Sequence, residues 1–325
     1  MPGLNILITR TDRIGDLVLT LPLASIIKKY LPDSKIAFLV SEYTRAIAEN
    51  CSAIDEVIIY QGASKKKLTL SKKFDIVICG YPTFDLAWLL FLSHIPIRIG
   101  TGYRWYSLLF NKRVYEHRKY GLKNELEYNA GLLRPLGINE MPTHQNVSFN
   151  LQPDLKSKQI IDEYLVSLGI DASKKIIIIH PGSGGSASDL PKSHLKELVN
   201  QLAHKLDCTI LITGSPVEKE LASYFVVRNN VHNAAGLFNL SSLIALIDRA
   251  FLLIANSTGP LHIAAALGKF VVGFYPKAQA TSPIRWGPYT ERKLIFTPPG
   301  ECLDCMKTID INHVFEEINS KWENI

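Results

Sequence analysis

The chain has 325 residues, of which 47% are hydrophobic and 20% are charged, and its formal net charge is +6. These values are typical of a soluble folded protein long enough for two domains, and they exclude an intrinsically disordered chain. No apolar run approaches the ~20 residues that a membrane-spanning helix needs.

The first half of the chain alternates short apolar strands with helices. Residues 1–3 run directly into the first strand, so we expect no signal peptide. Strands are expected at residues 4–8, 35–40, 56–60, 74–79 and 95–99, and helices at residues 17–30, 43–50, 83–92 and 124–135. This alternation predicts an open parallel sheet with right-handed crossovers, which binds ligands beside the carboxyl ends of its strands.

The loop at residues 10–16 follows the first strand and therefore occupies such a position. Gly15 allows the backbone a tight turn, and Asp16 falls at or beside the start of the next helix. Because Asp is a good N-cap, spacing alone favours a capping role over a catalytic one. The loop contains no G-x-G-x-x-G motif, which argues against a dehydrogenase.

Two segments of the first half are strongly basic. Residues 61–73 contain five lysines and no acidic residue, and residues 98–123 contain seven basic residues against Glu116 alone. A solvated surface is the simplest explanation, but two such segments in one half also fit an anionic partner. We expect no aromatic side chains interleaved with these charges, and therefore no nucleic-acid partner.

A polar stretch at residues 146–156 is the expected linker between domains 1–152 and 153–325. The second series of strands is expected at residues 176–179, 209–212, 251–255 and 270–274, with helices at residues 155–168, after Pro191, and at 217–227, 240–250, 260–267 and 312–322. Two similar α/β halves make a cleft between them the default ligand site.

Two loops of the second half have features of an anion site. The glycine-rich loop at residues 180–186 follows a strand, and its backbone N–H groups could cradle phosphates, although no GK[ST] follows. Residues 256–259 connect a buried strand to a small-residue helix, whose N-terminus favours an anion; Pro260 suits its first turn. The second loop could also be an ordinary βαβ corner without a ligand. The presence of both loops in one domain favours a binding site for a diphosphate.

The five cysteines are odd in number and mostly lie in apolar, strand-like surroundings. This favours reduced thiols in a cytosol. Cys302-x-x-Cys305 lacks a second pair, so a zinc site is the less favoured interpretation.

Several segments spread over nearly the whole chain share the pattern of one known family. They are ILITRTDRIGDLVLTLPL near the start, ELEYNAGLLRPLG at 125–137, IIIIHPGSGG at 176–185, ITGSPVEKELA at 212–222, NAAGLFNLSSLIALI at 233–247, NSTGPLHIAAALG at 256–268, and RWGP at 285–288. Through them the chain resembles glycosyltransferase family nine, the ADP-heptose:lipopolysaccharide heptosyltransferases.

The resemblance implies a GT-B architecture, in which two Rossmann-like domains face each other across a cleft. It implies metal-independent inversion at the sugar carbon without a cofactor, an acceptor in the N-terminal domain and a nucleotide in the C-terminal domain. The last helix, residues 312–322, would pack back toward the first domain. Asp16 is similar to the family's general base, and the helix N-terminus after Ser257 would stabilise the departing diphosphate.

The resemblance also implies the binding residues. Donor contacts would come from His180, Gly182, Ser183, Gly184, Glu218, Ser257, Thr258, Gly259 and His262. Glu218 matches a family acid that binds the ribose of the nucleotide. It could at the same time be an acidic residue in the first turn of a helix, where it favours the helix dipole. For His262 the alternative to donor binding is capping or packing within its helix. The acceptor side would be formed by Arg13, Lys65, Lys66, Lys67 and Arg104.

Two positions depart from the family pattern. Ser188 and its neighbours replace a segment that commonly carries a lysine, and Ser257 stands where Asp-Thr-Gly or Asp-Ser-Gly begins. Either the donor is not ADP-heptose, or another cation such as Lys192 compensates, or activity is reduced.

The sequence therefore predicts a cytoplasmic, inverting, nucleotide-sugar-dependent glycosyltransferase with peripheral contact at the inner face of the inner membrane. Its acceptor would be an anionic, lipid-linked or core oligosaccharide, and heptose is the first donor to consider. The same chemistry with another donor sugar, and a non-catalytic nucleotide-sugar binder, remain as alternatives.

Overall fold

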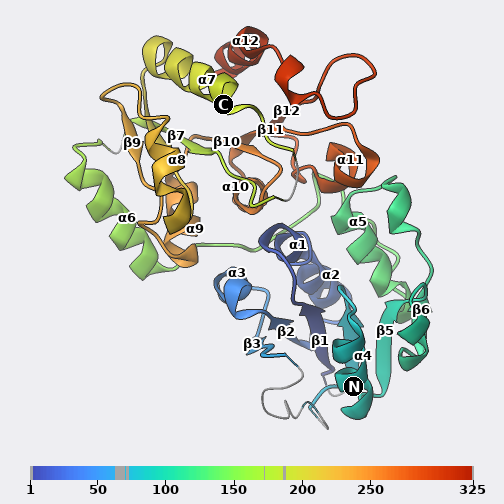
Figure 1. The fold of residues 1–325 in the computed structure, drawn as a ribbon. Coiled ribbons are helices and arrows are strands. Elements are labelled where there is room, and N and C mark those ends of the chain that lie inside the picture. Colours follow the sequence, from blue (N-terminus) through green and yellow to red (C-terminus); the bar gives the residue numbers. More distant parts are fainter. Residues whose placement is uncertain (1–2, 63–69, 71–72, 172, 186–187, 324–325) are drawn as a thin grey trace. The chain divides into compact units, whose positions relative to one another are not determined.

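The computed structural model describes residues 3–62, 70, 73–171, 173–185 and 188–323. The chain divides into two compact units, Met1–Leu151 and Gln152–Ile325, each built around a six-stranded sheet (Figure 1). Every strand pair is parallel, so the expected α/β class with two Rossmann-like sheets is confirmed.

The first sheet has the strand order β3-β2-β1-β4-β5-β6. Its strands are β1 (Asn5–Arg10), β2 (Lys35–Val40), β3 (Glu56–Ile59), β4 (Ile76–Cys79), β5 (Ile97–Thr101) and β6 (Lys112–Val114). The chain builds outward from β1 in one direction and then from β4 in the other. The carboxyl ends of β1 and β4 therefore flank the topological switch point, where ligands bind in this class of sheet.

Helices cover both faces of the first sheet. They are α1 (Ile14–Val18), α2 (Pro22–Tyr30), α3 (Arg45–Glu49), α4 (Phe84–Leu92) and α5 (Glu125–Ala130), with 3-10 turns η1 (Glu42–Thr44), η2 (Trp105–Leu109), η3 (Arg118–Tyr120) and η4 (Gly131–Leu136). The buried side chains of α4 and η2 share one core with alternate strand residues such as Leu7 and Val77. The helix expected at residues 17–30 is two helices, because Pro22 has no N–H to continue the first one and instead begins α2.

The second sheet repeats this plan with the order β12-β11-β10-β7-β8-β9. Its strands are β7 (Lys175–His180), β8 (Cys208–Ile212), β9 (Val231–Asn233), β10 (Leu252–Asn256), β11 (Phe270–Phe274) and β12 (Lys293–Phe296). The switch point lies between β7 and β10. The glycine-rich loop and the loop at residues 256–259 therefore start on adjacent strands.

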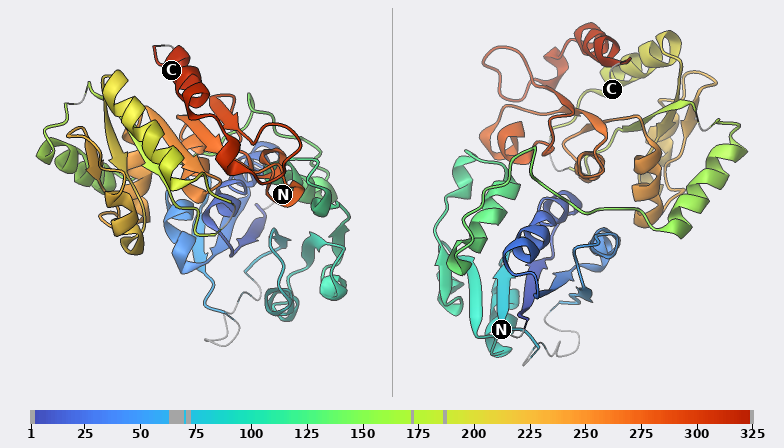
Figure 2. Two further views of the ribbon diagram at one scale, coloured as in Figure 1. Left: turned by 45° about the horizontal axis from the view of Figure 1, so that its top comes forward. Right: turned by 180° about the vertical axis from the view of Figure 1, so that it is seen from behind.

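The helices of the second unit are α6 (Leu155–Ser167), α7 (Lys192–Lys205), α8 (Lys219–Ser223), α9 (Leu240–Arg249), α10 (Gly259–Ala266), α11 (Pro283–Trp286) and α12 (Ile311–Lys321), with 3-10 turns η5 (Pro216–Glu218), η6 (Gln279–Thr281) and η7 (Met306–Thr308). The last helix, α12, lies beside α7 (Figures 1 and 2) and buries Val314, Phe315 and Ile318 in the core of this unit. Its apolar face is thus used within the second unit, and the expected packing toward the first unit stays a prediction.

The cysteines divide into two groups. Cys51, Cys79 and Cys208 are free and buried, as expected, but Cys302 and Cys305 form a disulfide. The expectation of reduced thiols was wrong for this pair, because the bends between them bring the two Cα atoms to 5.7 Å, within bridging distance. Within the described ranges, none of the helices combines the length and the apolar character needed to cross a membrane.

Candidate functional site

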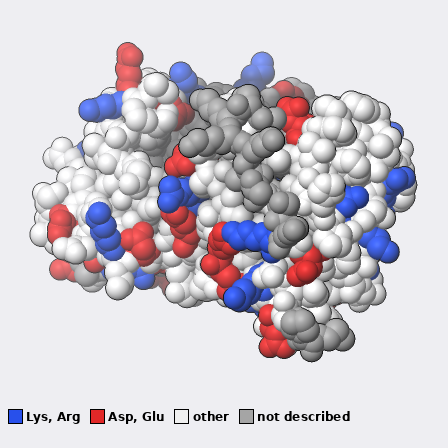
Figure 3. Space-filling model, turned by 90° about the horizontal axis from the view of Figure 1, so that it is seen from below, with Lys and Arg blue, Asp and Glu red and all other residues white. Residues whose placement is uncertain are grey.

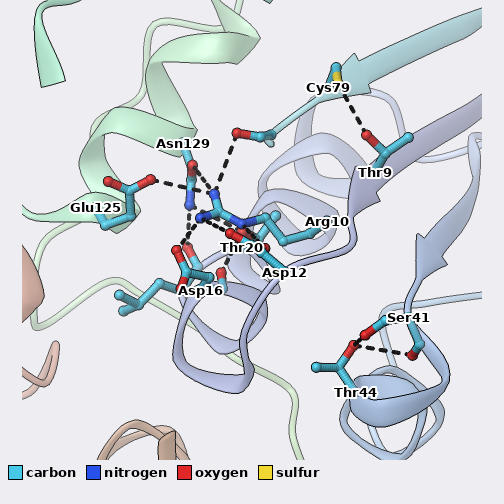
Figure 4. Close-up of polar contacts among 12 residues, drawn as sticks. Thr9, Arg10, Asp12, Asp16, Thr20, Ser41, Thr44, Cys79, Glu125 and Asn129 are labelled. Atoms are coloured by element: carbon cyan, nitrogen blue, oxygen red, sulfur yellow. Dashed lines mark hydrogen bonds and ion pairs between the residues drawn. The ribbon is translucent and has the colours of Figure 1, made fainter. Parts of the chain in front are cut away.

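A buried arginine organises the carboxyl edge of the first sheet. Arg10 is the last residue of β1, and its side chain is only 2% exposed. Its Nε and Nη2 donate to the two carboxylate oxygens of Asp12 at 2.8 and 3.0 Å, and Nη2 also pairs with Asp16. Figure 4 shows this guanidinium between the loop after β1 and helix α5.

The other side of the guanidinium faces α5 and β4. Nη1 lies 3.4 Å from Glu125 Oε1, 3.2 Å from Asn129 Oδ1 and 3.5 Å from the carbonyl oxygen of Gly80. The amide of Asn129 donates in turn to the Leu19 carbonyl and the Thr20 hydroxyl. A charge buried this deeply is tolerated only when it is paired and its donors are used, and Arg10 meets both conditions.

This network sets the protonation of Asp16. Its carboxyl group is 13% exposed, and burial raises its pKa to about 6; Arg10 opposes the rise, whereas the charges of Asp12 and Glu125 add to it. The carboxylates also hold the pKa of Arg10 above its ordinary value, although burial acts in the opposite direction. Asp16 is therefore a base that is mostly ionised at neutral pH and able to accept a proton, a combination found in general bases.

The capping role that spacing favoured for Asp16 was wrong. Asp16 lies inside the first turn of α1, where Arg13 is the N-cap residue and no side chain caps the helix. The carboxylate is instead turned to Arg10, because an unpaired buried guanidinium would cost more free energy than an uncapped exposed helix end.

The expected acceptor residues are only partly described. Arg13 and Arg104 are both exposed; Arg13 precedes α1, and Arg104 lies after β5, two strands from β1 at the same edge of the sheet. Lys65, Lys66 and Lys67 lie outside the described residues. The structure thus places two of the five expected acceptor residues, Arg13 and Arg104, at the edge of the sheet that holds Asp16.

In the second unit, expected donor residues meet at the carboxyl ends of β7 and β8. His180 Nδ1 lies 3.0 Å from the hydroxyl oxygen of Thr213, and burial lowers the pKa of His180 to about 4, although Glu218 acts to raise it. Glu218 accepts from the backbone N–H of Ser215 at 2.8 Å and from its hydroxyl at 2.6 Å. Glu218 therefore lies in the first turn of a helix, as expected. Its other carboxylate oxygen, Oε1, lies beside the glycine-rich loop at Gly182.

Glycine is required at position 182. A Cβ atom there would come within 1.8 Å of Glu218 Oε1, so the carboxylate occupies the space that a side chain would fill. Burial would raise the pKa of Glu218, but the hydrogen bonds from Ser215 and the nearby His180 outweigh it and hold the pKa below its usual range. This loop thus brings an ionised carboxylate and a neutral imidazole together beside main-chain groups.

The loops after β7 and β10 are joined by one buried amide. Asn256 is 2% exposed; its Nδ2 donates to the Pro181 carbonyl at 2.7 Å, and its Oδ1 accepts from the Leu190 N–H at 2.9 Å. The glycine-rich loop is therefore held at both ends by the strand that leads to α10. Sequence reasoning missed this role, although Asn256 closes the buried strand that precedes α10.

The start of α10 has an open N-terminus. Thr258 is the N-cap residue, and no side chain caps the helix, which begins with Gly259 and Pro260. His262, one turn along, is buried, and its Nδ1 has no hydrogen-bond partner among the described residues. Burial lowers the pKa of His262 to about 4, so the ring is neutral and able to donate or accept a hydrogen bond.

The two departures from the family pattern have different surroundings. The hydroxyl of Ser188 donates to Asp304 at 2.8 Å, beside the Cys302–Cys305 bridge. Ser257 hydrogen-bonds to Tyr275, a fully buried residue of the neighbouring strand end. Lys192, the cation considered as a substitute, begins α7 and is exposed.

No group of three or more His, Cys, Asp and Glu side chains that could hold a metal ion occurs in the described part of the chain. The functional residues that sequence reasoning missed are Arg10, Asp12, Glu125, Asn129, Thr213 and Asn256. A charged residue at the end of an otherwise apolar buried strand is the one signal that could have indicated Arg10, since such a charge needs partners.

Comparison with known proteins identifies one family. The model of glycosyltransferase family 9 (heptosyltransferase) matches residues 63–315. A putative glycosyltransferase of Haemophilus influenzae is 30% identical over 339 aligned positions, which cover 97% of this chain and 96% of the relative.

Solved structures share the fold over almost the full length. A family 9 glycosyltransferase from Veillonella parvula superposes with a TM-score of 0.86 at 20% identity, covering 99% of this chain and 98% of that one. The ADP-heptose lps heptosyltransferase II of Escherichia coli superposes with a TM-score of 0.80 at 19% identity, covering 99% and 100%.

Proposed function

The chain belongs to glycosyltransferase family 9, the heptosyltransferase family, and on that premise we propose that it transfers heptose from ADP-heptose to a lipopolysaccharide core or a related anionic glycan. The donor and acceptor are inferred from the name of the E. coli structural relative. We place the reaction in the cytoplasm, at the inner face of the inner membrane, where a lipid-linked acceptor would be found.

The proposed reaction is a single inverting displacement. The acceptor hydroxyl oxygen attacks the anomeric carbon from the face opposite the nucleotide, and Asp16 takes its proton as the new bond forms. The bond from the anomeric carbon to the diphosphate breaks at the same time, and ADP leaves with the electron pair. The uncapped N-terminus of α10 would stabilise the charge that develops on the diphosphate.

One observation carries this proposal. Asp16 has a pKa of about 6 and is held by Arg10 at the sheet edge where ligands bind in this fold class. A carboxyl group kept there only for stability would not need a raised pKa, since a lowered one gives more stability at neutral pH. Glu218 beside Gly182 would bind the ribose hydroxyls of the nucleotide.

We predict that Asp16→Asn lowers kcat by at least about a hundredfold, because proton transfer by a placed base contributes that much or more. ADP release and the mass of the glycan product would be measured with ADP-heptose and a truncated core acceptor. The affinity for ADP should stay the same, since the substitution leaves the second unit unchanged.

Asp85→Asn is the matched control, because Asp85 is also a first-turn carboxylate of a helix in the first unit but is exposed. Its turnover should equal that of the parent. Parental turnover by Asp16→Asn would show that Asp16 has no catalytic role.

Metal independence is a second prediction. If the α10 N-terminus and neighbouring donors neutralise the departing diphosphate, transfer should continue at the parental rate in EDTA. Kinetics with and without the chelator test this. Loss of activity that magnesium or manganese restores would mean that a divalent cation, and not the helix, stabilises the leaving group.

Another donor sugar is the second candidate, and the hydrogen bond between Ser188 and Asp304 favours it, because Ser188 stands where the family commonly has a lysine and is bonded to an acidic residue. A thermal-shift comparison of ADP-, GDP- and UDP-sugars distinguishes the candidates, since a ligand bound only by the native state raises the melting temperature. Binding without transfer to any acceptor would instead identify a non-catalytic homologue.

A further inference from the structure

The outer surface of α4 and η2 exposes large apolar side chains that belong to no core. We call this surface the aromatic face; it is formed by Phe84, Trp88, Phe91, Leu92, Trp105 and Leu108. Trp105 is 74% exposed and Leu108 is 67% exposed. An exposed helix normally turns polar side chains to water, so a contiguous apolar surface of this kind marks an interaction site.

The rings of the aromatic face are ordered against one another. Phe84 stacks on Trp105 with 4.9 Å between the ring centroids, and it also lies beside Trp88, which is followed by Phe91. The hydroxyl of Tyr106 donates to the Pro82 carbonyl at 2.7 Å and fixes η2 against the start of α4. The aromatic face is therefore a preformed platform.

Basic residues adjoin this platform. The Arg98 guanidinium lies over the ring of Phe91 at 5.4 Å. Arg104, Lys112, Arg113 and Lys119 have no ion-pair partner in the described part of the chain. Glu116, the one acidic residue of segment 98–123, is already paired with Lys123 and Arg134.

In the view of Figure 3, the right-hand part of the surface is largely uncharged and has Lys and Arg side chains near its edge. The expectation that segment 98–123 lacks interleaved aromatic side chains was wrong. Tyr103, Trp105, Tyr115 and Tyr120 alternate with its basic residues and are exposed.

We propose that the aromatic face docks on an anionic lipid bilayer. Tryptophan and phenylalanine rings beside leucine side chains, with arginine and lysine around them, have the composition of surfaces that insert shallowly among lipid headgroups. The uncompensated positive charge complements anionic headgroups, and each such residue near the surface strengthens binding about fivefold. Leu92 and Leu108 offer nothing to a nucleic acid, which would use stacking and hydrogen bonds.

The location of the aromatic face suggests that membrane docking serves the transfer reaction, an inference that rests on the proposed function. Strands β1, β4 and β5 are neighbours, so Phe84 and Trp105, which follow β4 and β5, lie at the same edge of the sheet as Asp16. Docking there would bring the glycan of a membrane-anchored acceptor to the base, without removing its lipid from the bilayer.

The test is co-sedimentation of the full chain with vesicles of phosphatidylethanolamine and phosphatidylglycerol, and with vesicles of phosphatidylcholine alone. We expect binding to the first and much weaker binding to the second. The double variant Trp88→Ser with Trp105→Ser should bind the anionic vesicles at least about tenfold less tightly, because it removes the two largest apolar groups.

A charge variant tests the electrostatic part independently. Lys112→Glu with Arg113→Glu should lose most of the binding at low salt, and parental binding should weaken as salt is raised. The matched control is Tyr224→Ser with Val166→Ser, because these side chains are also exposed and apolar but belong to the second unit. Circular dichroism and thermal unfolding compared with the parent verify that every variant is folded.

Three results would overturn the proposal: equal vesicle binding by the parent and the aromatic variant; a concentration-dependent dimer, seen by light scattering, that this variant dissolves; or preferential binding of a single-stranded oligonucleotide. A soluble, delipidated acceptor separates this proposal from the proposed function. The aromatic variant should transfer sugar to it normally. A parent that binds vesicles but transfers to neither acceptor would contradict the function alone.

Discussion

Arg10 carries a full charge that is buried at the end of an apolar strand. Removing its side chain would leave the carboxylates of Asp12, Asp16 and Glu125 facing one another with little solvent, a loss of about 3–5 kcal/mol in the free energy of unfolding. The arrangement is therefore important for stability and, under the proposed mechanism, for catalysis as well. Arg10 positions Asp16 and opposes the rise of its pKa.

A pH profile tests this role. Since Asp16 must be ionised to accept a proton and its pKa is about 6, kcat/KM should fall as the pH is lowered through about 6. Arg10→Lys keeps the charge but loses the two-oxygen contact with Asp12. It should move this acid limb to higher pH, because a cation held less firmly favours the carboxylate less.

Arg45→Lys is the control for that experiment, because Arg45 is an exposed arginine paired with Glu49. Its profile should match that of the parent. If Arg10→Lys leaves the acid limb in place and lowers only the melting temperature, Arg10 supports the fold without tuning the base.

For single residues, the sequence indicated the proposed base, Asp16, but not its surroundings. Asp16 could be selected from its loop and the family resemblance. Its partner Arg10 was overlooked, because Glu125 and Asn129 lie 115 and 119 residues away and only the fold brings them to the guanidinium. Spacing predicts an N-cap for Asp16, but the carboxylate pairs instead with Arg10, six residues earlier, which the distant Glu125 and Asn129 help to hold in place.

The elements that matter most in the second unit are the loop after β7 and the helix after β10. Asn256 connects them through two hydrogen bonds of a buried amide, one to each side of the glycine-rich loop. This side chain therefore helps to fix where the backbone groups of the expected diphosphate site lie.

Asn256→Ala should lower the free energy of unfolding by about 1–3 kcal/mol, because the Pro181 carbonyl and the Leu190 N–H lose their buried partner. It should also weaken ADP binding, since the loop is no longer held. Urea unfolding and calorimetry with ADP measure the two effects.

Asn239→Ala is the matched control, because Asn239 caps α9 in the same unit through its accepted bond from Ser242 N–H. It should cost about 1 kcal/mol in stability and leave ADP affinity unchanged. Equal loss of ADP affinity in both variants would show that general destabilisation, and not the loop, is responsible.

The central strands of both sheets could be predicted because each is a continuous apolar run covered on two faces. The outer strands β6, β9 and β12 were missed. Their sequences KRV, VHN and KLIF are short and partly exposed, and they are strands only because a neighbour in the sheet offers hydrogen bonds. Propensity carries little information where a neighbouring strand decides the structure.

For the whole molecule, the sequence predicted two α/β domains because the polar stretch at residues 146–156 interrupts two similar series of strands and helices. The structure adds that the units share one plan, because in each sheet the strand order reverses beside the first strand. In each unit, the last residue of a strand at this switch point donates a hydrogen bond to a carbonyl of the adjacent loop. This residue is Arg10 in the first unit and Asn256 in the second. The family resemblance, not the periodicity, assigned a different ligand to each unit.

The last prediction rests on the different ligands expected for the two units. All residues bound to Asp16 belong to the first unit, and all expected donor residues belong to the second. ADP should therefore raise the melting temperature of the parent and of Asp16→Asn by the same amount. At a hundred times Kd, a bound ligand stabilises the native state by about 2.7 kcal/mol. Glu218→Gln should lose most of this gain, because the ribose loses a charged acceptor.

Glu218→Gln is a mild change for the fold, since glutamine also completes a capping box with Ser215. Glu220→Gln is its control: it neutralises an exposed first-turn acid two residues further along. Its ADP-dependent shift should equal that of the parent. A reduced shift in Asp16→Asn, with a full shift in Glu218→Gln, would place the nucleotide in the first unit and reverse the proposed roles of the two domains.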